Sequence, residues 1–512
     1  MRHTLLFIVI RRLAWGIFAR LVLVAAAFAA ARGVAVTLSV KQRFAQLHRG
    51  AGATFGVLLF IILFSGTWSL GSDSLRLWWQ NLPAGEQLSL PLLTEKGMAQ
   101  LKDETFVQIN LPSVHYPVIS FCRHPGDCPV LLSAVTGEPV AGTAPTDTLT
   151  TLHKNLFLGF PGRLLISLFG FALALLLISG LVLHHRKIRH LFRLRWRQGA
   201  GLFAFDLHNL TGLWCYPWLV MFALTGALSG LGAFGTLMLA ERVSPQAPQQ
   251  VMQQLMSSFS EAESPGGEAQ SVTDLLRSLP QTQPGFIAQM LSWQNPARDN
   301  QILTIGGIRE GQPGSAYFEQ LRYQGVLLHL TAVRDSADQG LWTRAFIAIQ
   351  PLHYGQYSWL AAGAPGMSAL HFLAGFAACL LTLSGLAMRA LKAPDSLAYR
   401  LTMGLCSGVL PAGITLLLST WFSPLSAPAV FPVVWLITVF FTLFYSSLSR
   451  ALLFISLLSA AGLLAASLMH LSVSGGAQWY TDAALLLTAL CCLLCAIILW
   501  RETRCWSELC RN

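Results

Sequence analysis

The sequence has little charge. Charged residues make up 11% of the 512 residues, whereas hydrophobic residues make up 54%. A soluble domain carries about 25% charged residues, so this composition excludes a soluble enzyme. Apolar runs of about 20 residues, each long enough to cross a bilayer core, recur along the chain. The sequence therefore predicts an α-helical polytopic membrane protein whose immediate partner is the lipid bilayer.

Several motifs of redox and metal proteins are also missing. The chain has no C-x-x-C-H, which excludes a covalently attached c-type haem, and its ten cysteines lack the spacing of a zinc ribbon or a ferredoxin cluster. No G-x-G-x-x-G follows a strand-like run, so hydride transfer from a bound dinucleotide is not expected. Cys122 and Cys128 lie in a polar loop. An oxidising compartment would permit a disulfide between them, and we weigh this equally against two free thiols.

Eight membrane helices are expected, at residues 50–71, 163–185, 209–232, 366–390, 401–420, 430–448, 451–470 and 482–500. The net charge of +11 is concentrated in the short loops between them. Loop 186–206 has six basic residues against Asp206, whereas segment 72–152 has four Lys/Arg against eight Asp/Glu. The positive-inside rule makes the short loop cytoplasmic and the polar segments 72–152 and 241–352 external. The basic charge thus reports topology, and no nucleic-acid partner is expected.

The expected domain order is a basic N-terminal extension (1–40), a first span (41–71), an external α+β domain (72–162), two spans with a basic cytoplasmic loop (163–232), a second external domain (233–365), a fourth span (366–390), four additional helices (401–500) and a cytoplasmic tail (501–512). Strand-like runs at 106–111, 117–121 and 129–135 support the first external domain. Similar runs from about 284 to 333 support the second. Trp78 and Trp79 are expected in an interfacial aromatic belt. The alternative is that they shape, with Tyr354, a cavity for an external acceptor.

The first 390 residues contain an internal duplication. His48 and Gly66 in the first helix align with His208 and Gly226 in the third, and each histidine precedes its glycine by 18 residues. The second and fourth helices also match, since GFALALLLISGL from 170 corresponds to GFAACLLTLSGL from 375. The first four helices are therefore two copies of a two-helix unit.

Each copy contributes two histidines at equivalent places. His48 and His208 stand at the cytoplasmic start of the first helix of each copy, and His153 and His353 precede the second helix on the external side. Histidines facing each other across helices suit a bis-imidazole iron. The pattern predicts an inner haem b between His48 and His208 and an outer haem b between His153 and His353. The alternative is that these histidines lie at the interface and bond to water or lipid headgroups.

Other histidines compete for these roles. His184, in tandem with His185 at the cytoplasmic end of the second helix, is an alternative inner ligand, although we prefer to interpret the tandem as a plain basic flank beside Arg186. His371 lies within the fourth helix and is the strongest rival to His353. His470 belongs to the later helices and is expected to be interfacial.

At these residues the sequence resembles the PepSY-associated transmembrane helix (PepSY-TM) family. The matching motifs are LHRGAGATFGVLLFIILFSGT from 47, LHKNLFLGF from 152, DLHNLTGLWCYPWLVMFALTG from 206 and LHYG from 352, and VLLSAVTGEPVAG from 130 is similar to the strand element of PepSY modules. The resemblance implies PepSY-like external insertions and a haem b reductase of the bacterial inner membrane. Such a reductase passes single electrons to ferric siderophore iron or another periplasmic acceptor. The resemblance carries the haem-iron ligands over to His48, His153, His208 and His353.

Two other classes of function stay open. The external domains could bind or regulate a periplasmic partner with the helices acting as an anchor, or the duplicated halves could form a transporter; both lack haem. The four helices after residue 400 contain no flavin or nicotinamide domain, so the electron donor is expected to be a separate cytoplasmic reductase or a membrane quinol.

Overall fold

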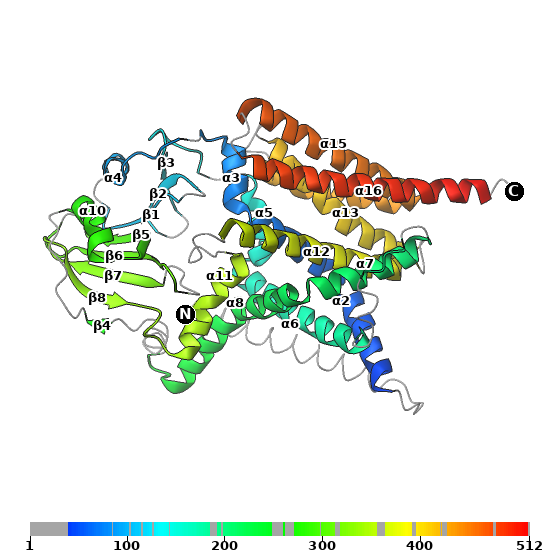
Figure 1. The fold of residues 1–512 in the computed structure, drawn as a ribbon, viewed down its shortest axis with the longest axis horizontal. Helices are drawn as coiled ribbons and strands as arrows, with labels where there is room; N and C mark the ends of the chain where they lie inside the picture. The colour runs from blue at the N-terminus through cyan, green and yellow to red at the C-terminus, as the bar shows by residue number, and fades with distance from the viewer. Residues whose placement is uncertain are drawn as a thin grey trace.

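A computed structural model describes residues 39–509 apart from 84, 102–103, 114–115, 125–126, 143, 185–191, 196–197, 248–259, 262–270, 297, 313–317, 356–363, 392–395, 420, 422–426 and 475–477. The molecule is a long helical body with a β-sheet at one end (Figure 1). The expected N-terminal extension lies, but for its last two residues, outside the described part of the chain.

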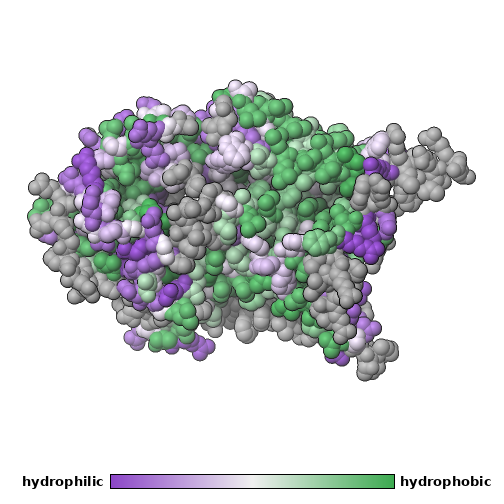
Figure 2. Space-filling model, viewed as in Figure 1, coloured by the Kyte–Doolittle hydropathy of each residue, from purple (hydrophilic) through white to green (hydrophobic). Residues whose placement is uncertain are grey.

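Seven described helices are long and apolar enough to cross a membrane. They are α2 (Val40–Ser69), α6 (Gly159–His184), α8 (Tyr216–Val243), α12 (Ala364–Ala390), α13 (Leu397–Leu418), α15 (Leu448–Ser474) and α16 (Trp479–Leu509). The remaining expected helix, 430–448, is present as α14 (Ala427–Phe444), whose apolar part is shorter than the others. The chain is a multi-pass membrane protein, and Figure 2 shows apolar side chains covering much of the helical body while polar ones gather over the sheet.

The third expected helix is divided in two. α7 (Ala200–Trp214) ends at Cys215, and α8 begins directly after it. Pro217 occupies the first turn of α8, where its missing N–H needs no partner, but it cannot continue the hydrogen bonding of a preceding helix. The prediction of one continuous helix over 209–232 is therefore wrong at Cys215.

The two copies of the repeat interlock as one bundle. α2 packs on both α6 and α12, α8 packs on α6, and α7 packs on α12. Each first helix thus contacts the second helix of both copies. The buried side chains shared among these helices are Leu59, Leu173, Leu177, Leu219, Ala223 and Ala378.

The four additional helices pack mainly against the first copy, with a smaller contact between α13 and α12 of the second. α13 pairs with α14, α15 pairs with α16, and α13 also contacts α2 of the first copy. α16 contacts α3 (Ser72–Gln80), a short helix directly after α2. The added bundle therefore breaks the approximate twofold repeat of the first four membrane helices.

Both external segments contribute to a single eight-stranded sheet, whose strand order is β3-β2-β1-β5-β6-β7-β8-β4. The first segment supplies β1 (Phe106–Asn110), β2 (Val118–Cys122) and β3 (Val130–Ser133); the second supplies β4 (Ser260–Glu261), β5 (Phe286–Gln294), β6 (Ile302–Arg309), β7 (Glu319–Gln324) and β8 (His329–Arg334). β1 and β5 pair antiparallel, with Val107 opposite Trp293. β1–β3 and β5–β8 form where the sequence predicts strands, whereas β4 lies before the predicted runs of the second segment. The expectation of two separate external domains is corrected, because backbone hydrogen bonds join their strands into one sheet.

Two short helices cover one face of this sheet. α4 (Leu90–Met98) and α10 (Val272–Thr282) come from different external segments, yet they contact each other. Their leucines Leu93, Leu275 and Leu279 are buried in the same apolar core as the strands. The external part therefore has one core to which both copies of the repeat contribute.

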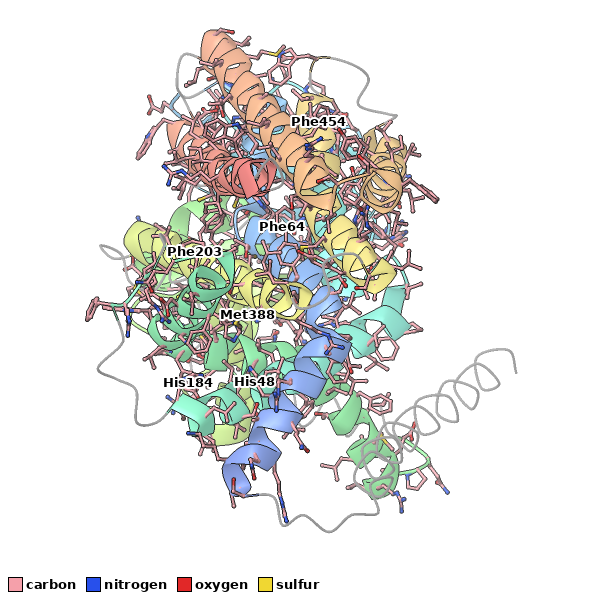
Figure 3. All side chains as sticks on the ribbon, turned by 90° about the vertical axis from the view of Figure 1, so that its right-hand side faces the viewer. His48, Phe64, His184, Phe203, Met388 and Phe454 are labelled. Atoms are coloured by element: carbon pink, nitrogen blue, oxygen red, sulfur yellow. A yellow bond between two sulfur atoms is a disulfide. The ribbon has the colours of Figure 1, made fainter. Side chains whose placement is uncertain are left out.

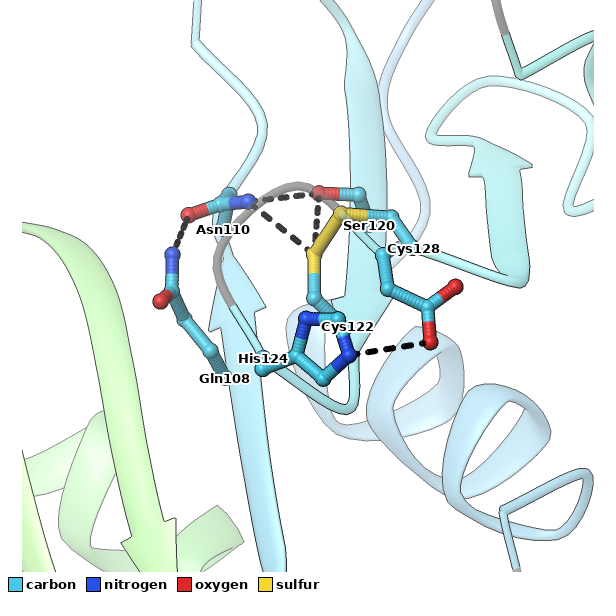
Figure 4. Close-up of a disulfide and its surroundings, with 7 residues drawn as sticks. Gln108, Asn110, Ser120, Cys122, His124 and Cys128 are labelled. Atoms are coloured by element: carbon cyan, nitrogen blue, oxygen red, sulfur yellow. Dashed lines mark hydrogen bonds and ion pairs between the residues drawn. A yellow bond between two sulfur atoms is a disulfide. The ribbon is translucent and has the colours of Figure 1, made fainter. Parts of the chain in front are cut away.

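Cys122 and Cys128 are disulfide-bonded at the end of β2 (Figure 4). Beside the bond, Asn110 on β1 donates to the hydroxyl of Ser120 at 2.8 Å. The two cysteines lie in the external segment, where the topology predicts an oxidising compartment. Of the two possibilities raised by the sequence, the structure has the disulfide.

Candidate functional site

The two histidines of the predicted cytoplasmic side lie next to each other. His48 on α2 and His208 on α7 have ring centroids 6.1 Å apart, with an angle of 77° between the ring planes. Nδ1 of His48 is 3.1 Å from the carbonyl oxygen of Leu176 and 2.9 Å from the hydroxyl of Ser179, both on α6. Figure 3 shows His48 at the end of the bundle where α6 ends at His184.

The same contact recurs in the second copy. Nδ1 of His208 is 2.8 Å from the carbonyl oxygen of Leu381 on α12. Leu176 and Leu381 occupy the same position of the repeated GFA motif, since each lies six residues after its first glycine. The duplication seen in the sequence is therefore also a duplication of hydrogen bonds.

The two external-side histidines form a second pair. His153 on α5 (Asp147–Asn155) and His353 on α11 (Leu341–Tyr354) have ring centroids 6.0 Å apart and ring planes inclined by 17°. Nδ1 of His153 is 2.9 Å from the carbonyl oxygen of Ile62, and Nδ1 of His353 is 2.8 Å from the hydroxyl of Thr225. Each helix of the second pair thus fixes its histidine against the first membrane helix of its own copy.

These hydrogen bonds define the tautomer of all four rings. Carbonyl oxygens only accept, and the hydroxyl of Thr225 already donates to the carbonyl of Met221 at 2.6 Å. Nδ1 therefore carries the hydrogen in each ring, and Nε2 is left with its lone pair. Burial lowers the pKa of His153 and, with His153 and His371 nearby, that of His353 to about 3, so both outer rings are neutral at physiological pH. Neutral imidazole is the form that binds metal ions.

A glycine faces each of the four rings. A Cβ built on Gly66 would lie 2.6 Å from Cε1 of His153, and one on Gly385 would lie 3.0 Å from Cε1 of His208. The corresponding distances are 3.4 Å from Gly180 to His48 and 3.5 Å from Gly226 to His353. The absent side chains let the imidazoles approach the helix backbones closely. Only glycine leaves the ring of His153 in its present place.

The two pairs stand at opposite ends of the bundle. Gly66, which contacts His153, follows His48 on α2 by 18 residues, and this corresponds to a rise of about 27 Å. That distance is close to the hydrocarbon thickness of about 30 Å. The arrangement has one pair of neutral imidazoles near each face of the membrane.

The rival histidines have other contacts. Nε2 of His371 is 2.8 Å from the carbonyl oxygen of Leu352, and its ring packs edge-on against Phe222. His184 lies 6.5 Å, between ring centroids, from Phe205. The described ring contacts between histidines join His48 to His208 and His153 to His353. His185 lies outside the described residues.

Three cations lie near His153 of the outer pair. Arg76 on α3 forms an ion pair with Asp147 at 2.7 Å, at the first turn of α5, the helix that carries His153. Partial burial, and after it the charges of Arg76 and Arg163, lower the pKa of Lys154, which directly follows His153. Arg163 donates to the carbonyl of Ser229 at 3.1 Å. The external side near His153 is therefore locally basic, although the external segments as a whole are acidic.

The structure corrects the predicted interfacial positions of Trp78, Trp79 and His470. Trp78 is fully buried and Trp79 is 9% exposed, so neither forms an interfacial belt. His470, expected at the interface, is 2% exposed and contacts Asp482. The sequence gives no signal for these contacts, because they join α3 to helices some 400 positions later.

A single C-x-x-C, Cys492 to Cys495, occurs inside the apolar α16, and neither of its thiols forms a disulfide.

Comparison with known proteins identifies the repeated part of the chain. The family described as the PepSY-associated TM region matches residues 45–392, which include both histidine pairs and the whole sheet. A protein of Pseudomonas aeruginosa described as uncharacterized is 46% identical over 288 residues, covering 54% of this chain and 73% of the relative. Since the family match extends over more than half of the sequence, the chain belongs to the PepSY-associated transmembrane family.

Proposed function

We propose that the protein is a haem b reductase of the bacterial inner membrane that relays single electrons to ferric iron held by a periplasmic siderophore. The observation that carries the proposal is the opposition of two histidine pairs at ring distances of 6.1 and 6.0 Å. Two imidazoles that share one metal at about 2 Å each, with about 1 Å from each nitrogen to its ring centre, have centroids roughly 6 Å apart. His48 with His208, and His153 with His353, would therefore hold one haem iron each.

The chemistry of the donor set agrees with haem. No group of three or more His, Cys, Asp or Glu side chains suited to a metal ion occurs among the described residues, so each pair suits a metal whose remaining ligands belong to a macrocycle. Hydrogen bonds from Nδ1 orient each ring and increase the basicity of Nε2. A haem iron with two imidazole ligands supplies one-electron transfer between Fe(III) and Fe(II). The protein's own part is to hold the four rings neutral, oriented and shielded from water.

The proposed acceptor is the ferric iron of a siderophore at the external end. The outer pair lies at the end of the helical body that carries the sheet (Figure 1). The three cations Arg76, Lys154 and Arg163 near His153 outnumber the two carboxylates that pair with Arg76. Such charge favours the approach of an anionic chelate. Reduction to Fe(II) weakens binding to hard oxygen donors and releases the iron. A regulatory anchor or a transporter would leave the four matched imidazole contacts without a role.

The test is the visible spectrum of detergent-purified protein, oxidised and dithionite-reduced, with a haem count per chain. Two low-spin b-type haems are expected. A single substitution by alanine should remove one haem when it is made at His48, His208, His153 or His353. The same substitution at His184 should remove none. A colourless preparation from haem-replete cells would contradict the proposal.

The acceptor is tested separately. Reduced protein is mixed anaerobically with ferric citrate, an anionic chelate, and in parallel with a ferric trihydroxamate siderophore. Reoxidation of the haem spectrum is followed together with Fe(II) capture by a ferrous chelator. Stoichiometric Fe(II) is expected. Two haems that stay reduced with ferric trihydroxamate, catecholate and citrate alike would retain the haem assignment and overturn ferric reduction.

A further inference from the structure

The short helix α3 is held from two sides. It contacts α16 of the added helices and also α5, the helix that carries His153 (Figure 1). Trp78 bonds to the added helices, whereas Arg76 bonds to α5. These two residues are two positions apart, which places them on nearly opposite sides of a helix with about 3.6 residues per turn. α3 therefore stands between the added helices and the outer histidine pair.

The added helices hold α3 through two indoles. Trp78 is fully buried, and its Nε1 donates to one carboxylate oxygen of Asp482 on α16 at 2.9 Å. Nδ1 of His470 on α15 lies 3.0 Å from the other oxygen, and its ring stacks on Trp78 at 4.6 Å. Nε1 of Trp79 donates at 3.1 Å to the hydroxyl of Ser419, the residue directly after α13. Because these groups are buried, a movement of α3 would leave polar atoms unpaired.

Arg76 holds the start of α5. Its Nε donates at 2.7 Å to a carboxylate oxygen of Asp147, which lies in the first turn of this helix. The N-cap residue Thr146 makes no side-chain hydrogen bond to the helix. A helix of nine residues is not stable on its own, so its place depends on contacts with other elements. The ion pair is therefore a fixed point for the N-terminal end of α5.

The guanidinium of Arg76 is itself fixed. It lies 3.5 Å from a carboxylate oxygen of Asp73, one turn earlier on α3. The ring of Tyr116, in the loop between β1 and β2, faces its Cζ at 5.9 Å from the ring centroid. The hydroxyl of Tyr116 donates to Gln80 of α3 at 3.3 Å. The position of the guanidinium thus follows that of α3.

The other end of α5 is under strain. Leu156 and Phe157, which come shortly after His153, have φ angles of 51° and 60°. This left-handed region is unfavourable for residues other than glycine, and such a backbone persists only where the surrounding structure holds it. When the start of α5 is released, the strained turn can relax and the ring of His153 can shift.

One apolar core spans the same junction. Leu75 of α3, Leu149 of α5 and Leu417 of α13 belong to it, together with Leu463 and Leu485 of the last two helices. Apolar burial is not directional, so it holds these elements together without fixing their orientation. The directional contacts are the two indole hydrogen bonds and the ion pair of Arg76.

We infer that α3 transmits the position of the added helices to the outer haem: Trp78 and Trp79 fix α3, and Arg76 is a positioning residue that fixes His153 through α5. The inference rests on the proposed function, within which it gives the added helices a role. The property that the link maintains is the angle of 17° between the rings of His153 and His353. The inner pair lies at the opposite end of the bundle, so the effect belongs to the outer haem.

The first experiment separates position from charge in the full-length purified protein. Arg76→Met removes the guanidinium at similar length, and Asp147→Asn removes the carboxylate charge at equal size. If the two residues acted only by charge, the reduction potential of the outer haem would fall in Arg76→Met and rise in Asp147→Asn. If they hold α5, both variants should change the low-spin ferric resonance of the outer haem in the same way, because this signal depends on the angle between the rings.

Hydrogen exchange follows the link without using the haem. The amides of α5 should exchange about threefold faster in Arg76→Met and in Asp147→Asn, as for the loss of a half-buried ion pair. Arg123→Met is the matched control, because it removes an ion pair of 2.8 Å with Glu104 on the sheet. It should leave the exchange of α5 and the outer resonance unchanged. Opposite shifts of the potential with unchanged exchange of α5 would overturn the inference and leave Arg76 as a charge alone.

A second set of variants tests the added helices. Trp78→Phe and Trp79→Phe remove the indole donors and keep an aromatic ring, and Trp79→Phe serves if Trp78→Phe lowers the yield of folded protein. Both should alter α5 and the outer resonance as Arg76→Met does. The double variant Trp78→Phe/Arg76→Met should change no more than Arg76→Met, because both residues act through one link. An unaltered α5 and outer resonance in both tryptophan variants would overturn the inference.

The haem count of the same samples distinguishes the two proposals. Two haems, with the outer resonance and the exchange of α5 unchanged in Arg76→Met, would overturn the link alone. A protein without haem would overturn the proposed function, whereas faster exchange of α5 in its Arg76→Met and Trp78→Phe variants would support the link.

Discussion

The ring of His153 lies so close to the backbone of Gly66 that a Cβ on this glycine would be 2.6 Å from Cε1 of the ring. Non-bonded carbon atoms pack at about 3.5–4.0 Å, so Gly66→Ala must displace the histidine. We expect the variant to lose the outer haem and keep the inner one. The measurement is the haem count per chain with the spectrum of the remaining haem.

Two other glycines provide controls for this prediction. Gly50→Ala lies on the same helix with nothing within 4 Å of the added Cβ, and Gly226→Ala would bring its Cβ to an ordinary contact of 3.5 Å with His353. The Gly50→Ala and Gly226→Ala variants should both retain two haems. An unchanged haem count and spectrum in Gly66→Ala would show that His153 is not an axial ligand in this position.

The two histidine pairs should differ in their electron paramagnetic resonance. The ring planes are inclined by 77° in the inner pair and by 17° in the outer pair. Nearly perpendicular imidazoles bring two iron d orbitals close in energy, which increases the anisotropy of a low-spin ferric signal. We expect two signals, with the larger maximum g value from the His48–His208 pair. His153→Ala should remove the less anisotropic signal, and a single signal shared by two haems would contradict this assignment.

The disulfide should stabilise the sheet without affecting the haems. Cys122 and Cys128 are six residues apart, and closing a loop of that size is worth about 2 kcal/mol in the free energy of unfolding. The double variant Cys122→Ala/Cys128→Ala should therefore exchange the backbone amides of β1–β3 faster, at an unchanged haem count. Cys215→Ala, which removes a free thiol from the membrane helices, is the control. Equal exchange in all three proteins would mean that the bond does not stabilise the sheet.

The stability of the loop before α7 should depend on an ion pair. Arg195 donates from Nε and Nη2 to the carboxylate of Asp206 at 2.7 and 2.6 Å. The hydrogen bonds from Arg195 lower the pKa of Asp206 below its ordinary value of 3.8. A depressed carboxyl pKa contributes stability that is present above the ordinary value and is lost as the pH falls through the folded one.

Asp206→Asn should accordingly melt at a lower temperature than the unmodified protein at pH 7. The difference should shrink as the pH falls below about 4, because the unmodified carboxylate then becomes protonated. Melting temperatures from pH 7 to pH 3 measure this convergence. A difference that is constant with pH would show that the loop depends on the shape of Asp206 and not on its charge.

The sequence predicts the histidine pairs because the repeat preserves spacing. His48 and His208 align without a gap, and the equivalent carbonyls of Leu176 and Leu381 follow from the second alignment. Helical periodicity and hydropathy are local properties, so the membrane helices and the strands could also be placed. The break at Cys215 escaped hydropathy, because both sides of it are equally apolar.

Contacts between distant segments could not be predicted in this way. Trp78 and Asp482 are separated by most of the chain, and an aromatic residue directly after a membrane helix is more commonly interfacial. The pairing of β1 with β5 likewise depends on how four membrane helices return both external segments to the same place. These features belong to the packing of whole elements, for which a single sequence has no local pattern.

The shared sheet has a consequence for synthesis. β1 leaves the membrane before α6, α7 and α8 are made, and its partner β5 emerges only after them. Until then, β1 presents one edge of unpaired backbone groups, which can pair with other chains. The sheet can therefore be completed only after β5 has been synthesised. Neither repeat produced alone contains all the strands of the sheet.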